Sequence, residues 1–369
     1  MTRKRVLFII FSIYGGGAEK QMQQLLSHLD RAKVEPHLAV FQITGKEENV
    51  VPAGIPVYDL STNLRPASVF LVIKLTKLIK KIQPDKILSF LWSVNIITLI
   101  SAWILRISDR VIISERTYLE LSVLRYRFAP LRNLVIRVCY PKAGKIIAVS
   151  RSVSRNLAEK YKIPPEKISV IYNGVDITEI EKKKKVISSP FCKKPYIVAI
   201  GGLRPEKNFS LLIKSFSIVA KQRSEINLLI LGEGSDRANL EVLTGALNLS
   251  NKVYLPGRVT NPFPYLSEAE IFVLSSKYEG FPNVIVEAMA CRVPVVAAAD
   301  SDSGITEILT DGQTGLLVDK SNDTVMAAAI AKLLVDKSLC KLLIENAYNR
   351  VLSAFSIEKT MESYKNLLQ

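Results

Sequence analysis

The chain has 369 residues, of which 48% are apolar and 23% are charged, a balance typical of a globular protein with room for two domains. It contains only two histidines, and its four cysteines lie far apart without a C-x-x-C pair. This excludes a histidine-rich metal centre and a cysteine zinc site, and it is typical of reduced thiols in a cytosolic protein.

The net charge of +16 is concentrated in the first half of the chain. Residues 1–185 contain 31 Lys/Arg and 15 Asp/Glu, whereas residues 186–369 contain 19 of each. Such asymmetry indicates an anionic partner for the first half, either nucleic acid or an anionic membrane surface. The sequence shows no nucleic-acid-binding module, so we expect the membrane surface and no nucleic acid.

The first half alternates short apolar strands with helices. Strands are predicted at residues 5–11, 35–41, 86–90, 110–114 and 145–149. The first follows three basic residues, but no A-x-A cleavage site comes after it, so we interpret it as a buried strand and not as a signal peptide. The uncharged stretch 88–105 carries several Ser, Thr and Asn residues, and we interpret it as a strand, a loop and a buried helix and not as a membrane span.

The second half repeats this alternation after a charged connector that contains four consecutive lysines, 182–185, and a Ser-Ser-Pro segment, 188–190. Strands are predicted at residues 195–200, 227–231, 252–255, 271–274 and 293–297. Continuous apolar strands that alternate with helices predict α/β domains with parallel sheets. Such sheets bind ligands beyond the carboxyl ends of their strands.

The segment 279–290 is the most informative part of the second half. It follows the strand 271–274, and Pro282 suits the first position of a helix because its missing N–H costs nothing there. Glu279 then lies in the loop and Glu287 about one turn into the helix, with exposed backbone N–H groups between them. This arrangement suits a polyhydroxylated phosphate ester, although an isolated E-x7-E pattern is more often an ordinary strand-loop-helix unit.

The neighbouring residues carry a specific resemblance. Glu-Gly-Phe-Pro-Asn at 279–283 and Glu-Ala-Met-Ala-Cys-Arg-Val-Pro-Val-Val-Ala at 287–297 resemble the E-x7-E element of retaining glycosyltransferases of family 4. The resemblance implies the GT-B fold, in which two Rossmann-like domains with parallel sheets face each other across a cleft. We expect an acceptor-binding domain at 1–187, a donor-binding domain at 188–354 and a final helix, 355–369, that crosses back to the first domain.

A second element lies between the predicted strand 195–200 and a predicted helix at 209–222. Its sequence, Gly-Gly-Leu-Arg-Pro-Glu-Lys-Asn at 201–208, resembles the family's G-R-L-x-x-x-K-N element. Lys207 matches the lysine that grips the pyrophosphate of a nucleotide-sugar. Gly202 stands where the family has an arginine, and Arg204 is the candidate to replace it.

The resemblance also implies roles for other residues. Glu279 would bind the transferred sugar and, with Arg204 and Lys207, form the catalytic group, while Glu287 would bind ribose hydroxyls. The remaining donor-binding candidates are Gly15, Gly16 and Gly17 after the first strand, Gly232 and Gly234, Arg258 and Val259, and the segment Gly280, Phe281, Pro282, Asn283 and Val284. For the glycine loops, plain βα turns are nearly as good an explanation.

One family feature is missing from the first half. Many members place a histidine after the fourth strand, near the transferred sugar, whereas this chain has Trp92 and Asn95 in its nearest candidate loop. Either Asn95 or a neighbouring polar group substitutes, or this contact is absent, and we include Asn95, Trp92 and Arg116 as acceptor-side candidates. His28 and His37 are expected to be structural.

The leading hypothesis is a retaining glycosyltransferase that moves a sugar from a UDP-sugar to a lipid-linked saccharide, in the synthesis of a surface polysaccharide such as lipopolysaccharide. It would need no metal and no other cofactor, because Lys207, Arg204 and the helix start supply the positive charge. Two alternatives stay open. They are a nucleotide-sugar epimerase of the same fold, disfavoured by the scarcity of acid/base residues, and a non-catalytic, membrane-docked binding protein, disfavoured by the intact Lys207, Glu279 and Glu287.

Two basic amphipathic segments, 69–81 and 110–145, predict where the protein meets the membrane. The second contains eight basic and two acidic residues, interleaved with apolar groups such as Tyr126 and Phe128. Apolar and basic side chains together suit an interface with anionic lipid. We therefore expect a cytoplasmic protein bound peripherally to the inner face of the membrane.

Overall fold

The computed structural model describes residues 3–43, 50–64, 67–119, 129–186, 191 and 193–368. The chain forms two compact units: unit 1 comprises residues 1–174 and 357–369, and unit 2 comprises residues 175–356. The boundary lies before the predicted one between residues 187 and 188, because helix α7 (Ile177–Lys183) packs against helices α10 and α11 of unit 2. The last helix belongs to unit 1 and begins at Ile357, so Phe355 and Ser356 stay with unit 2.

Unit 1 contains a seven-stranded parallel sheet with the strand order β3-β2-β1-β4-β5-β6-β7. Its strands are β1 (Lys4–Ile10), β2 (Val34–Val40), β3 (Val57–Asp59), β4 (Lys86–Phe90), β5 (Val111–Glu115), β6 (Lys145–Ala148) and β7 (Ile168–Val170). Its α-helices with given bounds are α1 (Gly17–Ser27), α2 (Ala67–Ile82), α3 (Trp92–Ile104), α5 (Ala129–Cys139), α6 (Arg151–Tyr161) and α14 (Ile357–Leu368). The short 3-10 helices are η2 (Ser108–Arg110), η3 (Tyr140–Lys142) and η4 (Pro165–Lys167).

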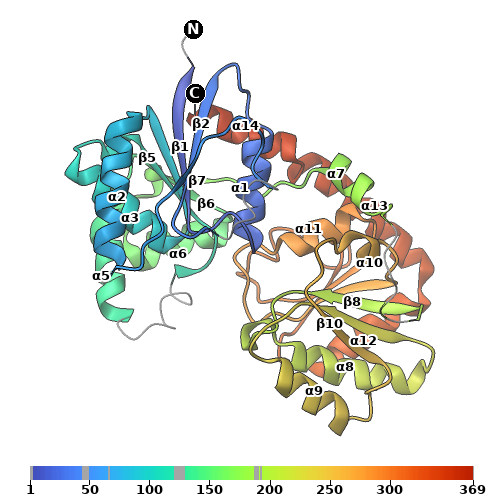
Figure 1. Ribbon diagram of the computed structural model, residues 1–369. Helices are drawn as coiled ribbons and strands as arrows, with labels where there is room; N and C mark the ends of the chain where they lie inside the picture. Colours follow the sequence, from blue (N-terminus) through green and yellow to red (C-terminus); the bar gives the residue numbers. More distant parts are fainter. Residues whose placement is uncertain are drawn as a thin grey trace. The chain divides into compact units, whose positions relative to one another are not determined.

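Helices cover both faces of this sheet: α1 and α14 lie on one face, and α2 and α3 lie on the other (Figure 1). Residues 6–10 of β1 are fully buried, as expected for a strand whose two sides are both covered. Phe8 of β1, Met22 of α1 and Tyr364 of α14 belong to one apolar cluster. The C-terminal helix is therefore part of the core of unit 1.

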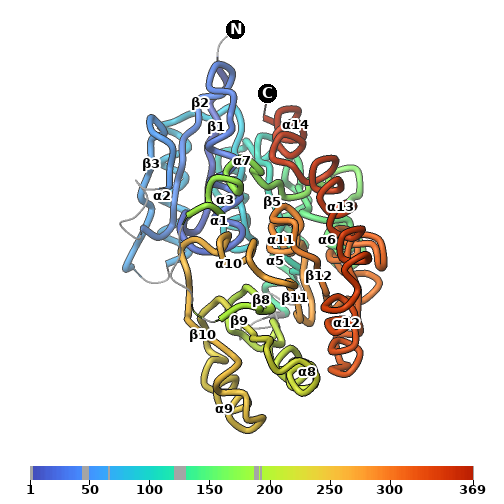
Figure 2. Tube along the Cα trace, turned by 90° about the vertical axis from the view of Figure 1, so that its right-hand side faces the viewer, coloured from blue at the N-terminus to red at the C-terminus, as the bar shows by residue number. Residues whose placement is uncertain are grey.

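Unit 2 contains a six-stranded parallel sheet with the order β10-β9-β8-β11-β12-β13, most of which can be followed in Figure 2. Its strands are β8 (Tyr196–Ile200), β9 (Asn227–Leu231), β10 (Val253–Gly257), β11 (Ile271–Leu274), β12 (Val295–Ala298) and β13 (Leu316–Val318). Besides α7, its helices are η5 (Pro205–Lys207), α8 (Phe209–Gln222), α9 (Arg237–Ala246), α10 (Phe263–Ser267), α11 (Asn283–Ala290), α12 (Asp323–Val335) and α13 (Lys337–Ala354).

The strand order of unit 2 reverses at β8, which lies between β9 and β11. Helix α12 packs beside α8 on one face of the sheet, and α11 packs against α13 and α7 on the other. In a doubly wound sheet the loops at such a reversal diverge to opposite faces and leave a crevice at the carboxyl ends of the strands. The loops after β8 and β11 are those that carry Lys207 and Glu279.

The structure corrects several local expectations. Strands β3, β7 and β13 were not among the ten predicted strands; each has three residues at an edge of its sheet, too few for an apolar pattern. Helix α3 begins at Trp92, directly after Leu91, so Trp92 and Asn95 lie in a helix and not in a loop. Helix α11 begins at Asn283, which makes Pro282 its N-cap and not its first residue. None of the helices in the described part of the chain combines the length and apolar character that crossing a bilayer requires.

Candidate active site

The carboxyl ends of β8 and β11 bring two of the predicted residues together. The Nζ atom of Lys207, at the end of η5, lies 2.5 Å from Oε1 of Glu279, although the two residues are 72 positions apart. Their side chains are only 20% and 13% exposed. In such a partly buried place charges interact more strongly than at an open surface. An ammonium group has three donors, so Lys207 can bind Glu279 and a phosphate oxygen together.

Two serines at the end of β11 fix this ion pair. The hydroxyl of Ser276 donates to Oε1 of Glu279 at 2.7 Å, and that of Ser275 donates to the carbonyl of Lys207 at 2.9 Å. The backbone adds a further link, since the amide of Lys277 donates to the carbonyl of Glu206 at 2.8 Å. The two loops are thus tied together by side chains and backbone, which holds Lys207 and Glu279 in one position.

Helix α11 starts four residues after Glu279. Its first residues, Asn283 and Val284, are partly exposed, whereas Glu287 lies one turn further on and is only 5% exposed. Phe281 is buried and packs edge-on against Phe355, with ring centroids 5.6 Å apart. The N-terminal end of α11 therefore carries a positive partial charge. It lies close in sequence to Glu279 and next to the well-packed Phe281.

Arg204 lies directly over Gly202, the position where the family arginine is missing. A Cβ atom on Gly202 would lie 3.3 Å from Nε of Arg204 and 3.8 Å from its Cζ. The guanidinium group also pairs with Oε1 of Glu206 at 3.2 Å, and 53% of the Arg204 side chain is exposed. Arg204 thus takes the space in which a side chain on residue 202 would begin.

The loops after β9 and β10 have a clear structural reason for their glycines. A Cβ on Gly232 would lie 1.8 Å from the carbonyl oxygen of Gly201, and one on Gly234 would lie 2.2 Å from that of Leu203. These two glycines therefore allow backbone to pack on backbone, and their role in donor binding stays a prediction. Arg258 and Val259 follow β10, with Arg258 exposed.

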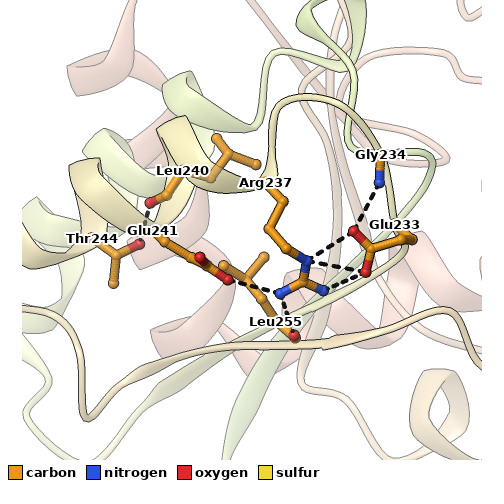
Figure 3. Close-up of polar contacts among 7 residues, drawn as sticks. All are labelled: Glu233, Gly234, Arg237, Leu240, Glu241, Thr244 and Leu255. Atoms are coloured by element: carbon orange, nitrogen blue, oxygen red, sulfur yellow. Dashed lines mark hydrogen bonds and ion pairs between the residues drawn. The ribbon is translucent and has the colours of Figure 1, made fainter.

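Next to these glycines, Arg237 forms an exposed ionic cluster (Figure 3). Its Nε and Nη2 atoms bind Glu233, and its Nη1 atom binds Oε1 of Glu241 and the carbonyl of Leu255. The hydrogen bond from Arg237 lowers the pKa of the Glu233 carboxyl. The cluster ties the start of α9 to β10 and so fixes the loop that holds Gly234.

In unit 1, the glycine loop after β1 leads into α1. Gly15 has φ of +149°, Gly16 is the N-cap of α1, and all three glycines, 15–17, are exposed. The amide of Gly16 donates to Oε2 of Glu19 at 2.9 Å. A carboxylate of the chain itself therefore occupies an amide that a donor phosphate was expected to use. The donor-binding role of this loop stays a prediction.

Asn95 does not offer its side chain to a ligand in this structure. It is fully buried, its Oδ1 accepts from Ser89 at 2.7 Å, and its Nδ2 donates to Glu115 Oε1 at 2.6 Å and to the carbonyl of Ser114 at 3.2 Å. The hydrogen-bonding groups of Asn95 are thus already used inside unit 1, and its substitution for the missing histidine stays a prediction that these contacts do not support.

The partner of Asn95 is a buried carboxyl at the end of β5. Oε1 of Glu115 accepts hydrogen bonds from Asn95 and from the hydroxyl of Tyr140. Burial raises the pKa of Glu115 to about 7, against the opposing effects of these two hydrogen bonds and of the positive charge of Arg116. Glu115 was not among the predicted residues. Its only signal in the sequence is an acidic residue at the end of an otherwise apolar strand.

Arg116 is likewise held inside unit 1. Its guanidinium donates to Oδ1 of Asn173 and to the hydroxyl of Tyr364 on α14, and it lies 3.9 Å from the centre of the Phe90 ring. Burial lowers the pKa of the Arg116 guanidinium. Arg116 therefore links the end of β5 to the last residues before the unit boundary and to the C-terminal helix. Of the three acceptor-side candidates, only Trp92 is partly exposed.

Within the described residues, no three His, Cys, Asp or Glu side chains converge in a way that would hold a metal ion. The serines that fix the Lys207–Glu279 pair were missed by the sequence analysis. They directly follow a buried strand, a position from which polar side chains often reach a ligand site in parallel sheets.

Comparison with known proteins covers both halves of the chain. Residues 15–179 match the model of Glycosyltransferase Family 4, and residues 180–350 match that of Glycosyl transferases group 1. The chain is 30% identical over 366 residues to the N-acetylgalactosamine-N,N'-diacetylbacillosaminyl-diphospho-undecaprenol 4-alpha-N-acetylgalactosaminyltransferase of Campylobacter jejuni, which covers 97% of this chain and 98% of the relative. It is 26% identical over 238 residues to the capsular polysaccharide biosynthesis glycosyltransferase CapM of Staphylococcus aureus, covering 61% of each chain.

Solved structures show the same fold. HepE of Anabaena in complex with UDP-glucose superposes with a TM-score of 0.82 at 20% identity, over 99% of both chains. Sucrose-phosphate synthase of Thermosynechococcus elongatus gives 0.80 at 20% identity, over 99% of this chain and 98% of the other. With two parallel α/β units and a relative that matches nearly end to end, the chain has the GT-B fold, is a glycosyltransferase and belongs to glycosyltransferase family 4.

Proposed function

We propose that the protein is a retaining glycosyltransferase that moves a sugar from a UDP-sugar to a saccharide linked to a polyprenyl diphosphate, at the inner face of a membrane. The observation that carries the donor side is the Lys207–Glu279 contact at the strand reversal of unit 2. The acceptor class is supported by the C. jejuni relative, whose name specifies a diphospho-undecaprenol saccharide. The UDP donor is supported by the HepE complex with UDP-glucose.

The roles follow from the charges in unit 2. In the transfer, the bond between the anomeric carbon and the UDP oxygen breaks, an acceptor hydroxyl oxygen bonds to that carbon, and the hydroxyl proton passes to the released diphosphate oxygen. The leaving diphosphate gains negative charge, which Lys207, Arg204 and the start of α11 stabilise without a metal ion. Glu279, held by Lys207 and Ser276, accepts hydrogen bonds from the transferred sugar. Glu287 accepts hydrogen bonds from the ribose hydroxyls.

The position of Arg204 supports its assignment as the replacement for the family arginine. Its guanidinium lies beside Gly202, where the family side chain would start. We expect its positive charge to reach the diphosphate from this position. The nucleotide-sugar epimerase is disfavoured because the chain has only two histidines, His28 and His37, and both lie in unit 1, outside the loops that carry Lys207 and Glu279.

Product analysis tests the proposal directly. The full chain is incubated with a panel of UDP-sugars, starting with UDP-N-acetylgalactosamine, with and without a polyprenyl-diphosphate saccharide, and with and without EDTA. We expect UDP release coupled to a new glycoside only when the acceptor is present, unchanged by EDTA, with the anomeric configuration of the donor retained by NMR. An epimerised nucleotide-sugar without acceptor would support the epimerase, and an inverted product would refute retention.

Lys207→Ala gives a residue-level test of the same proposal. Loss of one contact to the developing charge is expected to lower kcat/KM about a hundredfold, or roughly 2.7 kcal/mol. Lys337→Ala is the matched control, because Lys337 also pairs with a glutamate, Glu270, in unit 2 but its side chain is 70% exposed. Equal activity of the two variants would refute the role of Lys207.

A further inference from the structure

Helix α5 of unit 1 presents an apolar stripe to solvent. Leu131, Leu134 and Val138 are spaced three and four residues apart, which places them on one face of a helix. They are 60%, 57% and 53% exposed. Ile136, on the opposite side of the helix, is fully buried. The stripe is therefore a second apolar face of α5, in addition to the one that packs into unit 1.

A second pair of exposed apolar residues lies at the end of the neighbouring helix. Trp103 and Ile104 close α3, which packs beside α5, and they are 60% and 54% exposed. They border an open hollow of about 610 Å³ that is also lined by Arg106, Ser108 and Asp109. The Nζ atom of Lys142, in η3 directly after α5, lies 4.5 Å from the centre of the Trp103 ring. We call Trp103, Ile104, Leu131, Leu134 and Val138 the α3–α5 apolar surface.

The charges around this surface are nearly all positive. Across the described residues 67–119 and 129–161, which form α2 to α6 with the strands between them, there are 15 Lys/Arg and 4 Asp/Glu, one of them the buried Glu115. On α5 itself, Arg132 and Arg137 flank the stripe, and the helix has no acidic residue. Residues 120–128, including the predicted anchors Tyr126 and Phe128, lie outside the described residues.

We propose that the α3–α5 apolar surface is the face with which the protein docks on an anionic lipid bilayer. Apolar side chains on one side of a helix with basic residues around them suit the boundary between headgroups and acyl chains. A tryptophan beside a lysine suits the same depth, because its ring is apolar and its edge is polar. A second copy of the chain is a poor occupant, since two strongly basic faces repel each other.

This inference rests on the proposed function in one respect: a polyprenyl-linked acceptor is presented at a membrane, so docking would bring unit 1 to it. Arg132 connects the surface to the acceptor-side candidates, because its guanidinium lies 5.2 Å from the centre of the Trp92 ring. The docking face and the partly exposed Trp92 are therefore neighbours within unit 1.

The test is flotation of the full-length protein with vesicles of phosphatidylcholine, with or without phosphatidylglycerol. The test variant is Leu131→Ser/Leu134→Ser/Val138→Ser. The matched control is Val242→Ser/Val335→Ser/Leu342→Ser, which removes three apolar residues of unit 2 that are 73%, 63% and 52% exposed. We expect wild type and control to float only with phosphatidylglycerol, and less at high salt, and the test variant to bind about tenfold more weakly.

Trp103 provides a second readout that does not depend on substitutions in α5. The tryptophan emission of the wild type should shift to shorter wavelength with anionic vesicles, and Trp103→Phe should abolish that shift. Unchanged flotation of the test variant, equal loss in both triple variants, or no emission shift would overturn the proposal. Dimerisation in solution that disappears in the test variant would also overturn it in favour of a second copy.

Failure of docking and failure of the proposed function are separable. Transfer to a short, water-soluble diphosphate saccharide needs no membrane, so both triple variants should keep wild-type rates on it. Rates that stay normal while flotation is absent in every variant would refute docking alone. Absence of transfer in the wild type, with normal flotation, would refute the function alone.

Discussion

The two units share a doubly wound parallel sheet, but they use the ends of their strands differently. In unit 2, the Lys207–Glu279 pair is 20% and 13% exposed and lies where the strand order reverses. In unit 1, Ser89 of β4 and Glu115 at the end of β5 are buried, and both are hydrogen-bonded to the buried Asn95 of α3. One fold thus supports charged groups that a ligand can reach in one unit and a closed polar network in the other.

The glycines show a similar contrast. Position 232 in unit 2 has no room for a side chain, because a Cβ there would lie 1.8 Å from the carbonyl oxygen of Gly201. Gly15 in unit 1 has nothing within 4 Å of such a Cβ, but its φ of +149° is strained for any other residue. The loops of unit 2 therefore need glycine for close packing, whereas the first loop of unit 1 needs it for its backbone conformation.

The largest effect is expected from Gly232→Ala. The clash is with backbone that cannot move without displacing β8, so we expect a loss of at least about 4 kcal/mol in the free energy of unfolding, measured with urea. Gly15→Ala should cost less, about 1–3 kcal/mol of backbone strain. Gly245→Ala in α9 has open space and should stabilise by up to about 1 kcal/mol. A Gly232→Ala variant as stable as Gly15→Ala would remove the contrast.

Next comes the pH dependence that Glu115 gives to unit 1. Its folded pKa is about 7 and its ordinary value is 4.5, so between these values the folded state keeps a proton that the unfolded state loses. The contribution of Glu115 to the stability of the folded state is therefore fully present below pH 4.5, and it is lost as the pH rises through about 7. We expect Glu115→Gln to gain roughly 3 kcal/mol over wild type between pH 4.5 and pH 8.

The measurement is urea unfolding of both proteins across this pH range, since the difference cancels the other titrating groups. Glu115→Gln should leave kcat near the wild-type value, because the carboxyl is buried and touches no ligand in our assignment. A constant stability difference at all pH values would show that Glu115 is charged in the folded state. A collapse of kcat with intact stability would place Glu115 among the catalytic groups.

Substitution of Glu279 or Glu287 in unit 2 is expected to have the opposite effect. It should change the kinetics and leave the free energy of unfolding nearly unchanged. Glu279→Gln is expected to lower kcat about thirtyfold, or roughly 2 kcal/mol, because its contact lies at the reacting sugar. Glu287→Gln is expected to raise the KM for the donor about tenfold with kcat nearly unchanged, because a ribose contact is the same in the ground and transition states. The same pattern in both variants would refute this division.

The smallest effect is expected at Arg204, which is the most exposed of these residues. Arg204→Ala should lower kcat/KM about tenfold, or roughly 1.4 kcal/mol. The double variant Gly202→Arg/Arg204→Ala should recover most of that loss, because it returns a guanidinium to the family position and removes the Arg204 side chain, whose Nε lies 3.3 Å from the place of the new Cβ. Without recovery, Arg204 would not be the replacement for the family arginine.

The sequence by itself determined much of this protein. The apolar runs located ten of the strands to within a few residues, because a buried parallel strand is a local pattern. The resemblance identified the loops of Lys207 and Glu279. The uneven charge was also fixed by composition. The three-residue strands β3, β7 and β13 were not among them, since they are too short to leave such a pattern.

Only the tertiary structure decided which of these residues meet. The 2.5 Å contact between Lys207 and Glu279 joins residues 72 positions apart, and it depends on β8 and β11 being neighbours in the sheet. Hydrogen bonds between residues far apart in the sequence also hold two side chains inside unit 1. Asn95 is bound by Glu115, and Arg116 is bound by Asn173 and Tyr364. Strand order and burial are set by the packing of the whole core, and no local spacing of residues encodes them.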